Sequence, residues 1–213
     1  MIYTKFTKRM LDFLLSTIAL IILSPIIILL MIVGAVAVKG NPFFTQDRPG
    51  LNEKIFKLIK FRTMTNERDE NGEFLPDDVR LTTYGRILRK TSLDELPELL
   101  NIWRGDMAIV GPRPLLTRYL PFYTENERKR HSVRPGLTGL AQISGRNALA
   151  WDLRLALDVK YAEHITFWGD VRIILMTIVK VVKREDVVDA GNFEMLDLDQ
   201  ERKQAFASNK DRK

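Results

Sequence analysis

The sequence predicts an α+β protein with a mostly helical body, a small β element and an N-terminal membrane helix. The stretch 13–38 carries no charge and consists mostly of Leu, Ile, Val and Ala. Apolar residues recur at helical spacing through most of the body, and the segment 55–62 alternates apolar and basic residues as a strand does. We therefore expect a membrane segment over 1–39, a body over 40–190 and a C-terminal tail over 191–213.

The overall composition narrows the classes of partner and metal site. A chain of 213 residues is long enough to bury a real core. It has 33 Lys and Arg against 27 Asp and Glu, a net charge of +6, which indicates an anionic partner such as nucleic acid, anionic lipid or a phosphorylated substrate. The absence of Cys excludes disulfides and Cys-ligated zinc, and only two His argue against a multi-His site. A bound metal would be a hard cation with oxygen ligands.

The N-terminal apolar run exceeds the roughly 20 residues that a helix needs to cross a bilayer. It is too long for the apolar part of a cleaved signal peptide. Pro25, which follows Ser24 near its middle, removes a backbone donor and predicts a kink. Both a membrane span and a re-entrant hairpin fit, and spans are the commoner class. Basic residues flank the run on both sides, so the positive-inside rule sets no orientation: Lys5, Lys8 and Arg9 before it, Lys39 and Arg48 after it.

The body begins with an expected loop over 41–50 and a strand over 55–62. Lys60 and Arg62 of this strand either project into a site or lie on a solvated face. The polar stretch 65–80, with Asn71-Gly72 as a turn signal, is expected to be a surface loop.

Helices are expected over 81–90, from Ser92 to Gly105, from Thr124 (which has capping-box spacing to Glu127) to His131, and over 148–162. The segment 173–184 reads either as a core helix or as a helix on the membrane surface, because basic residues end an apolar run. From about Asp199 we expect a frayed polar tail.

Asp94 and Glu95 are adjacent carboxylates at the expected start of a helix. A helix N-terminus favours anions, so a carboxylate there should stay ionised, as a nucleophile or metal ligand requires. The alternative is purely structural, because Ser92 and Glu95 also have capping-box spacing.

Three arginines lie in rigid or glycine-rich turns, which suits fixed contacts to phosphate: Arg113, Arg134 and Arg146. With a membrane helix and a carboxylate pair, they indicate chemistry on a phosphorylated substrate at a membrane. A carboxylate can attack phosphorus to form an acyl phosphate, while magnesium and arginines stabilise the phosphate oxygens. The competing hypothesis is a membrane-tethered basic protein that binds anionic lipid or nucleic acid without catalysis. Arginines on turns, rather than in one basic run, argue against it.

From about Lys8 to Arg184 the chain resembles the bacterial sugar transferase family, the small monotopic phosphoglycosyl transferases that initiate glycoconjugate assembly. The resemblance is closest to the minimal members found in bacterial N-linked protein glycosylation. It is carried, in order, by Phe43-Phe44-Thr45-Gln46-Asp47-Arg48-Pro49-Gly50, Lys60-Phe61-Arg62-Thr63-Met64, the stretch from Thr91 to Pro97, Gly105-Asp106-Met107, Gly111-Pro112-Arg113-Pro114-Leu115, and the stretch from Arg134 to Gln142.

The resemblance implies transfer of a sugar phosphate from a UDP-sugar to undecaprenyl phosphate, with release of UMP. The sugar would be an N-acetylated amino sugar such as N,N'-diacetylbacillosamine. Asp94 matches the nucleophile, near which Mg²⁺ would bind, and Glu95 matches its acidic partner. We expect seven further residues to bind substrate, because they match family positions or because the strand pattern directs them toward the site. They are Lys60, Arg62, Arg89, Arg113, Arg146, Asp158 and Asp170.

The resemblance also bears on membrane topology and partners. Ser24-Pro25 matches the family's break, which implies a re-entrant helix-break-helix rather than a span. The enzyme would be monotopic in the bacterial inner membrane, with its active site on the cytoplasmic face and in contact with membrane lipid. No nucleic acid partner is expected, whereas downstream glycosyltransferases are possible partners.

Overall fold

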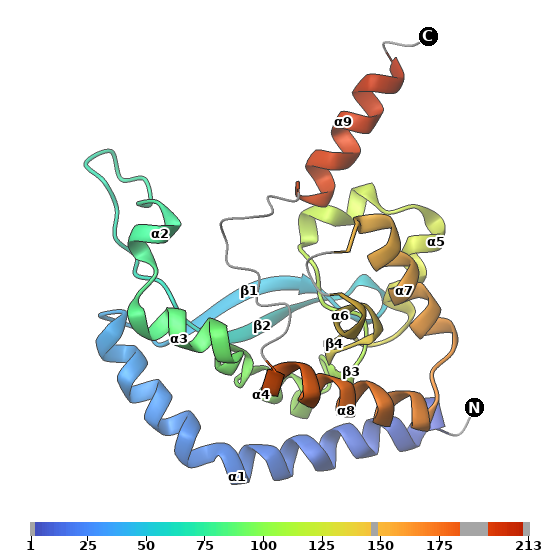
Figure 1. Ribbon diagram of the computed structural model, residues 1–213, viewed down its shortest axis with the longest axis horizontal. Coiled ribbons are helices and arrows are strands. Elements are labelled where there is room, and N and C mark those ends of the chain that lie inside the picture. Colours follow the sequence, from blue (N-terminus) through green and yellow to red (C-terminus); the bar gives the residue numbers. More distant parts are fainter. Residues whose placement is uncertain (1–2, 146–148, 184–195, 211–213) are drawn as a thin grey trace.

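The computed structural model describes residues 3–145, 149–183 and 196–210. A π-helical turn, Tyr3–Thr7, leads into α1, Lys8–Ala37, which curves beneath the body so that both of its ends rise toward it (Figure 1). The body combines two small sheets with surrounding helices, and the α+β class is confirmed.

α1 is one continuous helix that bends, and it does not break at Ser24-Pro25 as expected. Pro25 has no N–H, so the carbonyl of Ile21 loses its usual helical donor. The Ser24 hydroxyl donates to that carbonyl at 2.8 Å and replaces the lost bond. Among the described residues, α1 is the helix long and apolar enough to cross a membrane, and most of its apolar side chains are exposed. This exposed apolar surface suits contact with a membrane.

Polar contacts fasten the first half of α1 to the body. Arg9 donates to the carbonyls of Ile102 and Trp103 at 2.6 and 2.8 Å. The buried Asp12 carboxylate accepts from the amide of Ile109 at 3.0 Å. The Arg9 bond to Trp103 and the Asp12 bond from Ile109 satisfy backbone groups at the end of one helix and the edge of one strand. They fix α1 directly under the elements that build the site.

The sheets are small, and the sequence prediction covered only one of their strands. β1, Phe43–Pro49, pairs antiparallel with β2, Ile55–Phe61, from Phe43↔Phe61 to Pro49↔Ile55. The expected loop over 41–50 was thus wrong, because the polar residues of β1 hide its extended pairing. β3, Ala108–Val110, pairs parallel with β4, Gly136–Thr138. These strands were missed because three residues are too few to show a period. At Gly136 a Cβ would lie 2.0 Å from the Gly111 amide nitrogen, so only glycine fits.

The helices of the body largely follow the predicted periodicity. They are α2, Asp77–Arg80; α3, Thr83–Thr91; α4, Glu98–Arg104; α5, Glu125–Arg128; α6, Leu140–Ser144; α7, Trp151–Glu163; and α8, Phe167–Lys183. The capping box at Thr124 and Glu127 is confirmed. So is the end of α4 at Gly105, which adopts φ 95°.

The expected frayed tail is wrong from residue 198, because α9, Leu198–Lys210, is a helix. Its first turn packs on the body: Leu198 is fully buried in a cluster with Leu115, Tyr119 and Trp151. Arg202 adds contacts to carboxylates of α5 and α7 at 2.8 and 2.6 Å. These partners are distant in sequence, so local polarity concealed the helix.

Candidate active site

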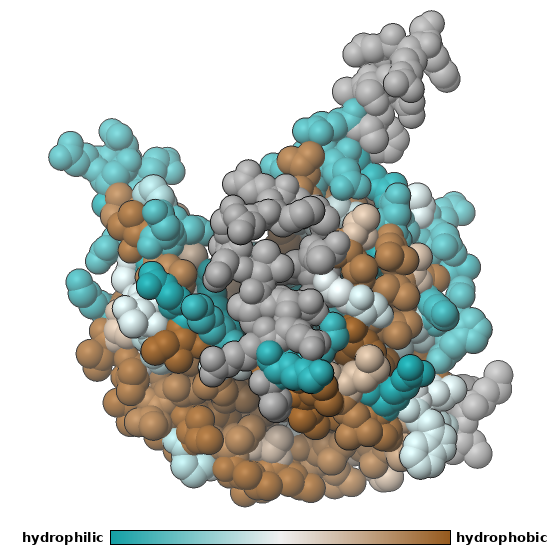
Figure 2. Space-filling view, viewed as in Figure 1, coloured by the Kyte–Doolittle hydropathy of each residue, from teal (hydrophilic) through white to brown (hydrophobic). Residues whose placement is uncertain are grey.

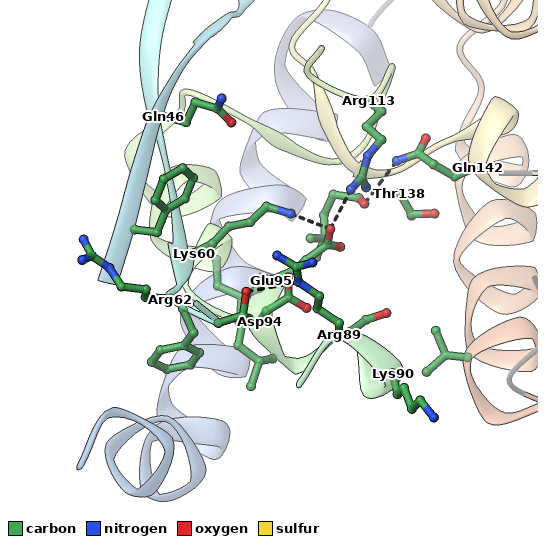
Figure 3. Close-up of a pocket in the computed structure, with 18 of the residues that line it drawn as sticks. Gln46, Lys60, Arg62, Arg89, Lys90, Asp94, Glu95, Arg113, Thr138 and Gln142 are labelled. Carbon is green, nitrogen blue, oxygen red and sulfur yellow. Dashed lines mark hydrogen bonds and ion pairs between the residues drawn. The ribbon is translucent and has the colours of Figure 1, made fainter. Parts of the chain in front are cut away.

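The segment between α3 and α4 places the two adjacent carboxylates at the edge of a cavity. Ser92 ends α3 in the left-handed conformation, with φ 56°, and Leu93–Glu95 form a 3-10 turn before α4. The capping-box alternative at this position is wrong, because the Ser92 side chain makes no capping bond and Glu95 bonds elsewhere. The sharp reversal at Ser92 turns both carboxylates toward β2 and the Arg113 turn (Figure 3).

Glu95 lies at the centre of a partly buried ion network. Its Oε1 accepts from Lys60 Nζ at 2.7 Å and from Arg113 Nη2 at 2.8 Å. Lys60 Nζ also lies 3.1 Å from Oε1 of Glu98, whose side chain is buried. Burial opposes ionisation of Glu95, but Arg113 and Lys60 outweigh it and lower the pKa of Glu95 to about 2. Burial and the neighbouring Glu95 charge raise the pKa of Glu98. Glu95 is therefore an anion whose charge is matched by two cations.

Asp94 has a different environment from its neighbour. Its carboxylate makes no ion pair with the residues that the structure describes. Burial and the Glu95 charge raise the pKa of Asp94, and Lys60 and Arg113 only partly oppose this. The expectation that a helix start alone keeps Asp94 ionised is therefore not met, since α4 begins only at Glu98 and desolvation dominates. A further cation beside Asp94 would favour its charged form.

The predicted basic residues differ in how closely they approach Asp94. Lys60 and Arg113 converge on Glu95, the neighbour of Asp94, and the Arg89 Nε lies 3.1 Å from Thr63 Oγ1 (Figure 3). Arg62 also lines the cavity, but it points away from Asp94 and donates to the carbonyl of Phe43 at 3.3 Å. Arg146 lies outside the described residues.

The two other predicted carboxylates already have protein partners. Asp158 Oδ2 pairs with Arg130 Nη2 at 2.7 Å, and both side chains are almost fully buried. Asp170 accepts from Lys8 and Tyr3 at 2.7 Å and from Tyr161 at 2.8 Å. Asp158 borders the cavity, whereas Asp170 is absent from its lining and ties the N-terminal turn to α8.

Two residues of the site were not predicted from the sequence. Glu98 follows Asp94 by four positions, a separation typical of one helical face, so it could have been suspected. Arg130 donates through Nη2 to the carbonyl of Arg113 at 2.6 Å and supports that turn from behind. It lies in a charged stretch where nothing in the sequence distinguishes it from its neighbours.

The cavity beside Asp94 measures about 1330 Å³ and is large enough for a nucleotide sugar. Basic side chains border it around the carboxylates, and apolar side chains of α1, α6 and α8 border it elsewhere. No group of three or more His, Asp or Glu capable of holding a metal occurs within the described ranges. A divalent cation here would need ligands from phosphate and water as well as from one carboxylate, as is typical of Mg²⁺. The geometry suits a carboxylate nucleophile acting on a bound phosphate.

Comparisons with known proteins give the family of this chain. The family model described as Bacterial sugar transferase matches residues 3–184. An uncharacterized sugar transferase, EpsL of Bacillus subtilis, is 53% identical over 163 residues, covering 76% of this chain and 81% of that protein. An undecaprenyl-phosphate galactose phosphotransferase of Salmonella typhimurium is 38% identical over 201 residues, covering 86% of this chain and 42% of that protein. A UDP-glucose:undecaprenyl-phosphate glucose-1-phosphate transferase of Klebsiella pneumoniae is 37% identical over 183 residues, covering 81% of this chain and 39% of that protein.

Proposed function

Because the chain belongs to the bacterial sugar transferase family, we propose that it transfers a sugar phosphate from a UDP-sugar to undecaprenyl phosphate and releases UMP. The names of the Salmonella and Klebsiella relatives describe this kind of acceptor. The single observation in this chain that carries the proposal is the site of Asp94. It is a carboxylate without an ion-pair partner among the described residues, beside a cationic cluster and a cavity of nucleotide-sugar size.

The proposed reaction has two displacements at one phosphorus. A carboxylate oxygen of Asp94 attacks the phosphorus that carries the sugar, and the bond from that phosphorus to the bridging oxygen breaks, so the oxygen leaves with UMP. A phosphate oxygen of undecaprenyl phosphate then attacks the same phosphorus and displaces the Asp94 carboxylate. The covalent aspartyl-phosphosugar divides one difficult transfer into two easier ones.

The surrounding residues have distinct proposed roles. Arg113 and Lys60 share the Glu95 charge and can donate their remaining N–H groups to phosphate oxygens. Glu95 holds these two cations in place rather than reacting itself. Arg89, anchored on Thr63, supplies another positive charge at the cavity wall. Asp94 is the oxygen donor available for Mg²⁺, which when bound would offset phosphate charge and help orient the reacting group.

The sugar and the location of the site are part of the proposal. Sugars named for two relatives are galactose and glucose, whereas the family resemblance implies an N-acetylated amino sugar such as N,N'-diacetylbacillosamine. We place the enzyme in the bacterial inner membrane with the cavity on the cytoplasmic face, where UDP-sugars are made. In this arrangement 1–39 is the re-entrant anchor and 40–190 the catalytic domain, with 191–213 as the tail.

A UMP-release assay tests this function. Purified protein in detergent with Mg²⁺ and undecaprenyl phosphate is given UDP-galactose, UDP-glucose, UDP-N-acetylglucosamine and UDP-N,N'-diacetylbacillosamine in turn. We expect UMP from at least one sugar, and a sugar-phosphate adduct by mass spectrometry when the acceptor is omitted. Asp94→Asn should abolish both signals without changing the Tm, because an amide is a poor nucleophile.

Two results would contradict the proposal. Full turnover by the Asp94→Asn variant would exclude the nucleophile assignment. Salt-sensitive binding to anionic vesicles or DNA without UMP release from any donor would favour the non-catalytic alternative.

A further inference from the structure

The cavity next to Asp94 has two unlike sides. Basic side chains surround the carboxylates, as described above. The rest of the lining includes an apolar wall contributed by α1, the turn before α4, β4 and α8: Ala19, Leu23, Leu96, Leu137, Ile174 and Ile178. A nucleotide sugar is polar along its whole length, so it gains little from such a wall.

Two hydroxyl groups within this wall, those of Thr138 and Thr177, pair with each other. The hydroxyls of Thr138 and Thr177 lie 2.7 Å apart, and the Thr177 hydroxyl also lies 2.7 Å from the Ile173 carbonyl. Neither hydroxyl needs water as a partner. The wall can therefore be covered by hydrocarbon without leaving either threonine unpaired.

The apolar wall is continuous with the outer apolar surface. Ile178 lines the cavity and is nevertheless 55% exposed, so it stands at the entrance. On the same helix Leu175 and Val179 are exposed, and on α1 so are Ile18 and Ile22. Figure 2 shows this surface as a broad hydrophobic base formed by α1 and α8. Among the described residues, apolar side chains thus connect that surface to the cavity at Ile178.

We propose that the passage between α1 and α8, entered beside Ile178, holds the isoprenoid chain of the polyprenyl phosphate. This inference rests on the function proposed above and adds the path by which the acceptor arrives. The acceptor carries one anionic head and one slender branched hydrocarbon chain, which matches a cationic end joined to an apolar passage. Its phosphate would reach Asp94 from the membrane side, while the nucleotide sugar enters from water.

A matched pair of variants on α8 tests the passage. Ile178→Trp narrows the entrance, whereas Leu175→Trp makes a similar change at a residue that is 58% exposed and does not line the cavity. We expect Ile178→Trp to raise the KM for undecaprenyl phosphate by roughly tenfold or more, because displaced methylenes lose their burial. The KM for UDP-sugar and the acceptor-independent UMP burst should not change. Leu175→Trp should match wild type, and equal KM values in the two variants would overturn the proposal.

Photocrosslinking identifies the occupant directly. Position 178 or 175 is replaced by p-benzoylphenylalanine in protein reconstituted in phosphatidylglycerol vesicles with undecaprenyl phosphate. After irradiation, the masses of the crosslinked adducts are measured by mass spectrometry. We expect an undecaprenyl phosphate adduct at 178 and phospholipid adducts alone at 175. Phospholipid alone at both positions would overturn the proposal. If wild-type protein turns over no UDP-sugar, the proposed function fails, while the crosslinking result still decides which lipid occupies the passage.

Discussion

Arg130 and Asp158 form an ion pair in which both side chains are buried. The pair lies directly behind the Arg113 turn. Removing one member of such a pair leaves an uncompensated buried charge, which costs roughly 3–5 kcal/mol. At the scale of single residues, Asp158 contacts Arg130, and Arg130 in turn contacts the backbone of Arg113. This pairing offers a structural role for Asp158 beside the substrate contact that the family resemblance implies.

Asp158→Asn separates these two roles. We expect the variant to lose roughly 3–5 kcal/mol of stability, seen as a lower Tm in detergent, because the charge of Arg130 is no longer matched. Below the new Tm, the KM for UDP-sugar should change little. Arg130→Lys is the companion variant and should keep part of the stability, since an ammonium can still pair with Asp158. A large rise in KM with an unchanged Tm would instead support direct substrate contact.

His131 provides a pH-dependent element of stability away from Asp94. Its ring is buried against Tyr123, and burial, followed by the charge of Arg130, lowers the pKa of His131 to about 3. In the unfolded chain the pKa is about 6.5, so between these values only the unfolded state binds the proton. Stability is therefore complete above pH about 6.5 and falls by about 1.4 kcal/mol per pH unit as the pH decreases toward 3.

The measurement compares wild type with His131→Phe, which cannot titrate, by thermal unfolding at pH 7.5, 6.5 and 5.5. The Tm of wild type should fall faster below pH 6.5 than that of the variant. Parallel pH curves for the two proteins would show that His131 does not carry this dependence.

At the scale of elements, α9 is held by its first turn. Leu198 is fully buried among Leu115, Tyr119 and Trp151, and the Trp151 indole donates to the Leu196 carbonyl at 2.8 Å. Leu198→Ala should cost about 2–5 kcal/mol through the cavity it leaves. We expect a lower Tm and a red shift of tryptophan emission, because Trp151 becomes more hydrated. Leu196→Ala is the control: Leu196 is 42% exposed, and its substitution should leave both readouts near wild type.

How well each element could be predicted follows from where its stabilising partners lie. α3, α7 and α8 carry their own helical period, and β2 carries its own alternation, so the sequence indicates them directly. β1, the β3–β4 pair and α9 depend on partners far along the chain, and local composition does not indicate these partners. The same reasoning holds at the site. Motif spacing found Lys60, Asp94, Glu95 and Arg113. Only the fold shows that Lys60 lies between Glu95 and Glu98.

At the scale of the whole molecule, hydrophobic and hydrophilic surfaces are segregated. Figure 2 shows a hydrophobic base over α1 and α8. Hydrophilic surface lies over α2 with the loop before it, and over the region of α5 and α7. Together with the bend of α1, this segregation favours a protein that rests in one leaflet with its body in water. A straight span would have to place residue 4 and the body on opposite faces of the membrane.

This topology can be read out cleanly because the chain has no cysteine. Thr4→Cys and Glu73→Cys each introduce one thiol, the first before α1 and the second in the exposed loop that precedes α2. In intact spheroplasts a membrane-impermeant maleimide should label neither variant, and after permeabilisation it should label both, because a re-entrant α1 returns its two ends to the cytoplasmic side. Labelling of Thr4→Cys alone in intact spheroplasts would establish a span. Pro25→Ala restores the missing N–H and removes the ring clash that bends α1, so in the Thr4→Cys background it should shift part of the population to that externally labelled form.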